Sequence, residues 1–359
     1  MAAAASNISV TYNGTYAASM LLEPIFRSDE VMQNYTVFPN VKYKQNVLLA
    51  NGLSKIVMAN AGCTSGTDNS GTGLSTSFNI DDKVLEVSNC SVKMSQCFDT
   101  FTQQVIVESY KAGINMPDLS GTELARVIAD RVQKGLAQDI VRVMWGGDSA
   151  SSDVTYAWAD GLFKLFNAAS ITPIQHKVAS GTGQTAVGGA LAGSDVVSLL
   201  TKVFDQAPAN LQQTPAGEKK MFVTPNIYNA YYGELTLIGS TGAVEAGRAE
   251  AQSGAGYSRL FFRGVEIIPM YEWDTIFTDL TPALWNLDNG SGAHDYKNAV
   301  VYAAKSNLMI GSDVTSQETQ FKMFYDEVSD NMYIRSLFKM GYQFGYNSLI
   351  ACGALVDAS

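Results

Sequence analysis

The chain has 359 residues, of which 46% are hydrophobic and 16% are charged, a composition that excludes a disordered protein. Its formal net charge of −10 and the absence of a basic stripe in the sequence argue against tight binding to phosphate backbones, which needs clustered Lys and Arg. No apolar run approaches the roughly 18 residues of a membrane-spanning helix, so no membrane partner is expected. This length predicts about two domains, and the low density of charged side chains favours association between copies of the chain.

The N-terminal part of the chain predicts an arm followed by a ribbon. Residues 1–40 are mostly small and polar, and we expect them to form an arm with little core of its own. Residues 41–97 predict a two-stranded β-ribbon, because strand-like segments flank a stretch over 60–77 that is rich in Gly, Ser, Thr and Asn. Such a ribbon is marginally stable in water by itself, so we expect it to lie on another surface.

The next segment predicts one very long helix over residues 120–145. Ser120 and Glu123 form a capping box, and a pair of glycines after Trp145 ends the helix. The apolar residues that recur at helical spacing between these ends are Leu124, Val127, Ile128, Val132, Leu136, Ile140, Val141 and Met144. A helix of this size is about 37 Å long, which is more than twice the usual length in globular proteins.

The second half of the chain alternates between helices and buried strands. We predict an amphipathic helix over 194–208, a short buried strand over 221–225 and a helix that begins at Asn226. An extended segment over 259–273 and one buried strand over 297–311 follow.

The chain closes with two strands, and the second carries a long aromatic stripe. We expect the strands to meet at a turn of residues 329–331. One parity of the second strand comprises Phe338, Met340, Tyr342, Phe344 and Tyr346, and the opposite parity includes Gly341 and Gly345. Period-two alternation is typical of a strand with two different faces. This strand therefore either completes a core or offers an edge to a neighbouring molecule.

No group of residues in the sequence predicts a catalytic, cofactor-binding or metal site. His176 and His294 lie in polar, loop-like contexts without partners at metal-binding spacing, and we expect both at the surface. The glycine-rich stretch over 181–189 lacks the residue order and the lysine of a phosphate-binding loop. Cys63 is expected to be exposed in the 60–77 stretch, but no histidine is near enough in the sequence to activate it.

The cysteines and the N-terminus indicate a reducing, aqueous compartment. The start of the chain, MAAAASNISV, lacks the basic region and the apolar core of a signal peptide. The four cysteines are too scattered for a disulfide framework, and none has the spacing of a zinc site: Cys63, Cys90, Cys97 and Cys352.

The order of these elements resembles the major capsid proteins of tailed double-stranded DNA phages, which have the Hong Kong 97-type shell fold. The stretch NAGCTSGTDNSGTG over 60–73 is similar to the tip of the extended loop of that family. The segment TELARVIADRVQKGLAQDIVRVMWGG over 122–147 looks like its spine helix, and RLFFRGVEIIPMYEW over 259–273 looks like a strand that precedes the last part of such proteins.

The resemblance implies an α+β fold in five parts. These are an N-terminal arm over 1–40, an extended β-ribbon loop over 41–97, a peripheral domain over 98–192 with its spine helix over 120–145, an axial α/β domain over 193–320, and return strands of the peripheral domain over 321–359. In this arrangement the aromatic stripe packs under the spine helix, and Gly341 and Gly345 let another segment approach from the other side.

The resemblance also implies a function without enzymatic activity. The chain is expected to self-assemble into hexamers and pentamers of an icosahedral head that encloses double-stranded DNA, which it holds weakly and without sequence preference. Its further partners would be a scaffolding protein, a portal and a decoration protein, with assembly in the cytoplasm of a host bacterium and a final location in the virion. Two alternatives remain: an encapsulin-like nanocompartment shell, and an α/β enzyme with a mobile lid at 60–77.

Overall fold

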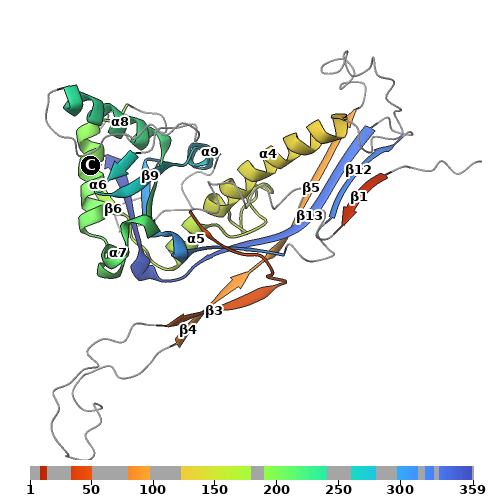
Figure 1. Cartoon of the computed structure of the whole chain (residues 1–359), viewed down its shortest axis with the longest axis horizontal. Helices are drawn as coiled ribbons and strands as arrows, with labels where there is room; N and C mark the ends of the chain where they lie inside the picture. The colour runs from red at the N-terminus through yellow and green to blue at the C-terminus, as the bar shows by residue number, and fades with distance from the viewer. Residues whose placement is uncertain are drawn as a thin grey trace, which may run out of the picture.

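The structure is a computed structural model, which describes residues 9–13, 34–50, 80–97, 123–178, 190–240, 260–279, 297–313, 320–326 and 331–357. Two six-stranded sheets occupy the two ends of an elongated body, and a two-stranded ribbon projects away from it (Figure 1). A long helix runs along one of the sheets (Figure 1). The fold is therefore a mixture of helices and largely antiparallel sheets.

The first sheet is built around one long central strand. Its members are β1 (Ser9–Asn13), β2 (Thr36–Phe38), β5 (Ser88–Cys97), β11 (Leu308–Ser312), β12 (Gln320–Asp326) and β13 (Asn331–Phe344). β5 pairs along one edge of β13, and β12 and then β11 pair along the other edge. β1 adds to β12, and β2 runs parallel to β11. The predicted closing pair, β12 and β13, is confirmed, and the predicted arm over 1–40 contributes both β1 and β2, which stand at the two ends of the strand order.

The long helix α4 (Glu123–Gly146) covers one face of this sheet, which confirms the predicted helix except for its first turn. Even-numbered hydrophobic side chains of β13 are buried on this face, namely Ile334, Phe338, Met340, Tyr342 and Phe344. The Tyr342 hydroxyl donates a hydrogen bond to the carbonyl oxygen of Ile140 at 3.1 Å. The aromatic stripe is therefore a core face, and Tyr346 lies beyond the end of the strand. Ser120 of the predicted capping box lies outside the described residues.

The second sheet has helices on both of its faces. Its strand order is β6-β14-β10-β7-β9-β8. The strands are β6 (Ile174–Val178), β7 (Lys219–Val223), β8 (Leu260–Phe262), β9 (Val265–Pro269), β10 (Ala299–Ala304) and β14 (Ile350–Asp357). The helices are α5 (Leu162–Ala168), α6 (Gly193–Asp205), α7 (Ala209–Gln213), α8 (Pro225–Ser240) and α9 (Glu272–Asp279).

Alternate residues of β10 show why this strand reads as a continuous apolar run. Val300 and Tyr302 pack in a core with α6 and α8, whereas Val301 and Ala303 pack on the other face in a core with α4, α5 and α9. A strand that is buried on both faces has no polar side.

The chain passes from one sheet to the other three times, first between β5 and β6 through α4 and α5, and then twice through short turns. β10 passes through a short 3-10 turn, Lys305–Asn307, into β11 of the first sheet, and β13 passes through Asn347–Leu349 into β14 of the second. The single strand predicted over 297–311 is therefore two strands in different sheets. The boundaries expected at 193 and 321 also differ from the sheets, because β6 and β14 belong to the second sheet and β11 belongs to the first.

Aromatic side chains fill the junction between the two sheets. The ring of Trp145, at the end of α4, lies 4.9 Å from that of Trp273 in α9 and 5.4 Å from those of Phe163 in α5 and Phe222 in β7, measured between centroids. The Trp145 indole N–H donates to the hydroxyl of Tyr35 at 3.3 Å. Because the buried cluster that contains these rings also includes residues from strands of both sheets, the two sheets share one continuous core.

Several predicted segments end earlier than expected. The extended segment over 259–273 is a hairpin of β8 and β9, turned at Arg263 and Gly264 with φ of 48° and 81°, and it is followed by α9. The helix predicted over 194–208 ends at Asp205. The predicted ribbon is shorter than 41–97, because β5 leaves it to pair with β13. The stretch over 60–77 lies outside the described residues.

We predict that Phe338→Ala destabilises the subunit by about 3–5 kcal/mol, because it opens a cavity in the core between β13 and α4. Leu337 lies next to it on the opposite face of β13 and is half-buried, so Leu337→Ala should cost less. Urea unfolding of the purified variants, followed by circular dichroism, gives both free energies of unfolding. Equal losses would show that the two faces of β13 are buried alike.

Candidate assembly interface

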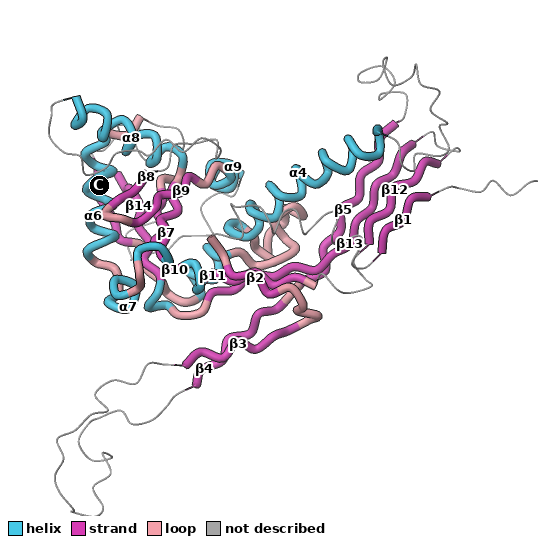
Figure 2. Tube along the Cα trace, in the orientation of Figure 1, coloured by secondary structure: helices cyan, strands magenta, loops and turns pink. Residues whose placement is uncertain are grey.

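The ribbon consists of β3 (Lys44–Ala50) and β4 (Ile80–Glu86), and it has two different faces. Figure 2 shows it leaving the body beside β2 and pointing away from both sheets. Residues that stand directly opposite each other in antiparallel strands point to the same side. Leu48 opposite Asp82 and Asn46 opposite Val84 therefore form an outer face, and Leu85 opposite Gln45 belongs to the inner face.

The inner face packs onto the ribbon's own subunit. Leu85 is fully buried and forms a small core with Val41 and Val87, against which Phe38 and Val47 also pack. The surface on which the ribbon was expected to lie is, at its base, the back of the first sheet. Farther out along the ribbon, Leu49 of β3 is also buried, and its side chain lies near Gly345, the residue that follows β13.

The base of the ribbon crosses the first sheet where two glycines stand side by side. Gly341 of β13 is directly opposite Gly311 of β11. A Cβ atom on Gly341 would lie 1.9 Å from the carbonyl oxygen of Glu86 in β4, and one on Gly311 would lie 3.0 Å from the Leu85 side chain. No side chain fits at Gly341 while the ribbon is in place. This confirms the close approach predicted at Gly341, where the approaching segment is β4. At Gly345 the nearest atom to an added Cβ would be the side-chain oxygen of Asn307, at 2.8 Å.

Polar side chains on the same face of β13 hold the crossing in place. The Gln343 amide donates to the carbonyl oxygen of Val84 at 3.0 Å. The Lys339 ammonium lies 4.4 Å from the ring centroid of Tyr43, a cation–π contact, and donates to the carbonyl oxygen of Lys42 at 3.4 Å. Sequence reasoning missed Lys339 and Gln343, because nothing in the pattern of β13 shows which segment lies on it.

The outer face of the ribbon is open. Leu48 is 71% exposed and Val84 is 40% exposed, and the two are diagonal neighbours across the strands. The Lys44–Glu86 ion pair at 3.0 Å lies beside Val84 on this face, and the hydrogen bond from Asn46 to Asp82 at 3.3 Å links the two strands between the apolar residues. An exposed apolar pair on a projecting ribbon is typical of a surface that contacts another molecule.

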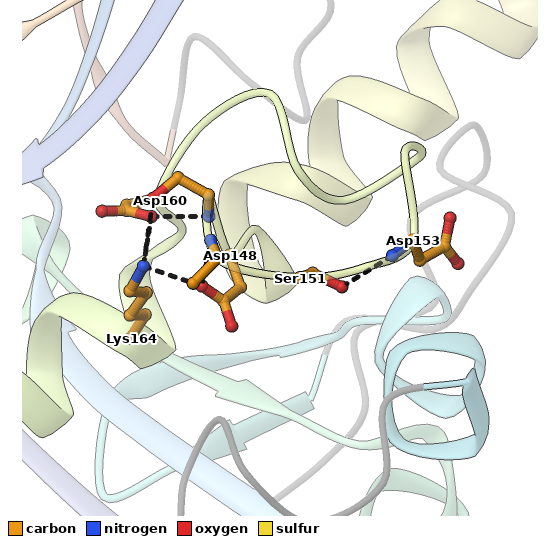
Figure 3. A network of polar contacts seen from close by, with 7 residues as sticks. Asp148, Ser151, Asp153, Asp160 and Lys164 are labelled. Carbon is orange, nitrogen blue, oxygen red and sulfur yellow. Dashed lines mark hydrogen bonds and ion pairs between the residues drawn. The ribbon is translucent and has the colours of Figure 1, made fainter.

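The loop between α4 and α5 contains the densest polar cluster near the sheet junction. The Lys164 ammonium binds the carboxylates of Asp148 and Asp160, each at 2.7 Å (Figure 3). Burial opposes the charge of Lys164, but its hydrogen bonds to the two carboxylates outweigh burial and raise its pKa. A lysine held in this way stays protonated and is not a general base. Farther along the loop, the backbone N–H of Asp153 donates to the Ser151 hydroxyl at 3.1 Å (Figure 3). The cluster therefore gives the loop a fixed shape.

The histidine and cysteine residues of the described part do not form a chemical site. His176 lies in β6 and not in a loop, and its Nε2 is 3.6 Å from the Asp195 carboxylate of α6. Both of its ring nitrogens are buried, so the surface position predicted for His176 is wrong. Cys90 and Cys352 are buried free thiols, and burial raises the pKa of Cys90 to about 12 and also raises the pKa of Cys352. His294 and Cys63 lie outside the described residues.

No three His, Cys, Asp or Glu side chains among the described residues are arranged to hold a metal ion. No helix in the same part of the chain is both long enough and apolar enough to cross a membrane.

Gly341→Ala is expected to push the base of the ribbon away from the sheet, because its Cβ cannot coexist with the Glu86 carbonyl oxygen. Overpacking of this kind costs about 1–3 kcal/mol, so the subunit should still fold. Hydrogen exchange measured by mass spectrometry should be faster in residues 44–50 and 80–86. As a control, Gly135→Ala on the exposed side of α4 meets no atom within 4 Å and should stabilise the helix by about 0.5–1 kcal/mol. If hydrogen exchange in the ribbon is the same in Gly341→Ala as in the wild type, Gly341 does not hold the ribbon on the sheet.

Comparisons with known proteins relate the fold to phage capsid structures. No protein-family model matches the sequence, and no curated protein matches it. A chain of the satellite phage P4 procapsid, a structure that includes the size determination (Sid) protein, is 12% identical over 99% of this chain and 95% of that chain, with a TM-score of 0.55. A chain of the capsid structure of the cyanophage P-SCSP1u is 10% identical over 100% of this chain and 93% of that chain, with a TM-score of 0.50. The chain therefore has the mixed helix-and-sheet fold found in these phage capsids.

Proposed function

We propose that this chain is the major capsid protein of a tailed double-stranded DNA phage, with a Hong Kong 97-type fold, and that it self-assembles into hexamers and pentamers of an icosahedral head. The observation that carries the proposal is the ribbon, whose inner face is anchored on its own subunit and whose outer face exposes Leu48 and Val84. A protein that functions as a monomer would not need a projecting ribbon with an exposed apolar face. The fold likeness to the P4 procapsid chain supports the same conclusion.

The two sheets fit the two domains of such a subunit. In this proposal the first sheet with α4 is the peripheral domain, α4 is its spine helix, and the second sheet with α6 and α8 is the axial domain. The ribbon is the extended loop. The sheet pairings move the boundaries, because β11 goes to the peripheral domain and both β6 and β14 go to the axial domain.

The energy of assembly would come mainly from apolar contact repeated in every copy. Full burial of a side chain such as Leu48 or Val84 contributes about 1.5–3 kcal/mol, and association itself costs several kcal/mol in lost freedom of motion. One ribbon contact is therefore weak. A closed shell makes each contact in every subunit, so small contributions add up over the assembly.

The remaining partners follow from this role. A scaffolding protein, a portal and a decoration protein would join the shell, which would be assembled in the host cytoplasm and would end in the virion around loosely held DNA. The encapsulin-like alternative has no support from the P4 and cyanophage relatives, which are phage structures. Negative-stain electron microscopy of the purified protein tests the proposal directly, since it requires hexamers, pentamers or particles of uniform diameter.

Leu48→Asp combined with Val84→Asp should leave the subunit folded, because both side chains are exposed. The same change should prevent closure of shells, because two carboxylates would be buried without partners at the contact. Circular dichroism reports folding, and electron microscopy reports closure.

The matched control adds the same charge on the exposed side of α4, through Gln138→Asp combined with Lys134→Gln. Among the residues that the structure describes, Lys134 is paired with the exposed Asp130 at 2.9 Å and with no other, so its loss should have little effect on stability. Normal shells from the ribbon variant would rule out the outer face of the ribbon as the contact.

A further inference from the structure

Three cations stand in one row across the face of the first sheet that points away from α4. The pairing register places Lys322 of β12 opposite Arg335 of β13, and Arg335 opposite Lys93 of β5. The even-numbered neighbours Ile334 and Phe338 are buried under α4, so the row lies on the opposite face. Lys93 and Arg335 are exposed and Lys322 is half-buried. Because neighbouring strands are about 4.8 Å apart, the three positive charges span about 10 Å. We call these three residues the basic row.

The basic row disfavours folding of the subunit that carries it. Like charges directly opposite each other in a sheet are destabilising. None of the three side chains has a hydrogen bond or an ion pair to any residue that the structure describes. The chain has a net charge of −10, so a local group of unpaired cations is unexpected from composition. Because these unpaired cations reduce the stability of the subunit, we expect the basic row to bind an anionic ligand.

The side chains beside the basic row add hydroxyl donors that suit the oxygens of a phosphodiester. The rings of Phe324 and Tyr333 are stacked at 5.3 Å in the next row of the same face. Ser95 stands opposite Tyr333, and Ser91 stands opposite Leu337 on the other side of the row. Lys, Arg, Ser and Tyr side chains are the usual donors to phosphate and sugar oxygens.

The described ribbon leaves this part of the face open. The ribbon base crosses β13 at Gly341, and the nearest cation, Lys339, is occupied by Tyr43. Arg335 is four residues farther along the strand, on the side where β5, β12 and β1 extend away from the ribbon (Figure 2). The basic row is therefore not a part of the ribbon anchor.

We propose that Lys93, Arg335 and Lys322 bind the phosphodiester backbone of nucleic acid. The proposal deepens the proposed function and rests on it, because packaged DNA would be the polyanion. Contact with about three phosphates predicts a slope of about −2.7 for the logarithm of the binding constant against the logarithm of the salt concentration. Because the three cations would contact phosphates and not base edges, binding should have no sequence preference. The basic row could not be predicted from the sequence, where no basic stripe is present.

The test uses the full chain and a fluorescein-labelled 20-base-pair duplex, with binding followed by anisotropy between 25 and 200 mM KCl. Lys93→Gln combined with Arg335→Gln should weaken binding by about tenfold at low salt and reduce the slope from about −2.7 to about −0.9. The matched control, Arg131→Gln combined with Lys134→Gln, removes the same charge from the exposed side of α4 and should change neither value. Equal loss of binding in both variants, or in neither, would overturn the proposal.

Two further measurements distinguish nucleic-acid binding from a structural role of the basic row and from binding of a different anion. Because like charges are removed, the melting temperature of the Lys93→Gln, Arg335→Gln variant should equal or exceed that of the wild type. A clear decrease would show that the basic row is structural and would overturn the binding site. At matched charge, unlabelled duplex should compete better than inorganic phosphate or poly-glutamate. Equal competition would overturn a nucleic-acid backbone site in favour of a free anion or an acidic protein. Shell formation is scored separately by electron microscopy. Salt-dependent duplex binding by a wild-type chain that forms no shells would refute the proposed function and support the basic row.

Discussion

The strand β13 carries different chemistry on its two faces, and much of the described molecule depends on this difference. On one face the side chains from Phe338 to Phe344 pack under α4, and full burial contributes roughly 1.5–3 kcal/mol for each of them. On the other face Gly341 has no side chain, so β4 lies directly on the backbone of the strand. The same strand therefore stabilises the subunit and sets the direction in which the ribbon leaves it.

The base of the ribbon packs directly on the body of the subunit. Trp145 packs with rings from α5, α9 and β7, so the second sheet shares its core with α4 and β13. The inner face of the ribbon is stabilised by burial of Leu85, and only its outer face lacks a partner in the described chain. A two-stranded ribbon alone is marginal. The anchor supplies the missing support, and it also explains why the proposed contact lies on the outer face.

Local periodicity was sufficient to predict the elements that form one amphipathic unit. The helix α4 and the alternate burial of β13 follow from spacing alone, because each depends on which side chains share a face. Spacing could not show which sheet a strand joins. The turn at Lys305–Asn307 interrupts an apolar run that reads as one strand, and it sends β11 into a different sheet from β10. His176 was predicted to lie at the surface because its neighbours in the sequence are polar. Spacing could not show that side chains alternate along this strand and that His176 is on the face toward α6.

The ribbon and the basic row of this acidic chain differ in how their charges are paired. On the ribbon, Glu86 is paired with Lys44, whereas Asp82 accepts a hydrogen bond from the neutral amide of Asn46, so Asp82 is the unpaired charge beside Leu48 and Val84 in the described part of this face. Charges farther away are screened over about 8 Å at physiological salt and oppose association weakly. The basic row has no such internal partner, so its attraction for an anion weakens as salt rises. Apolar contact does not weaken in this way. The two surfaces therefore respond differently to salt, and a shell held by its ribbons would stay closed at concentrations that release nucleic acid from the basic row.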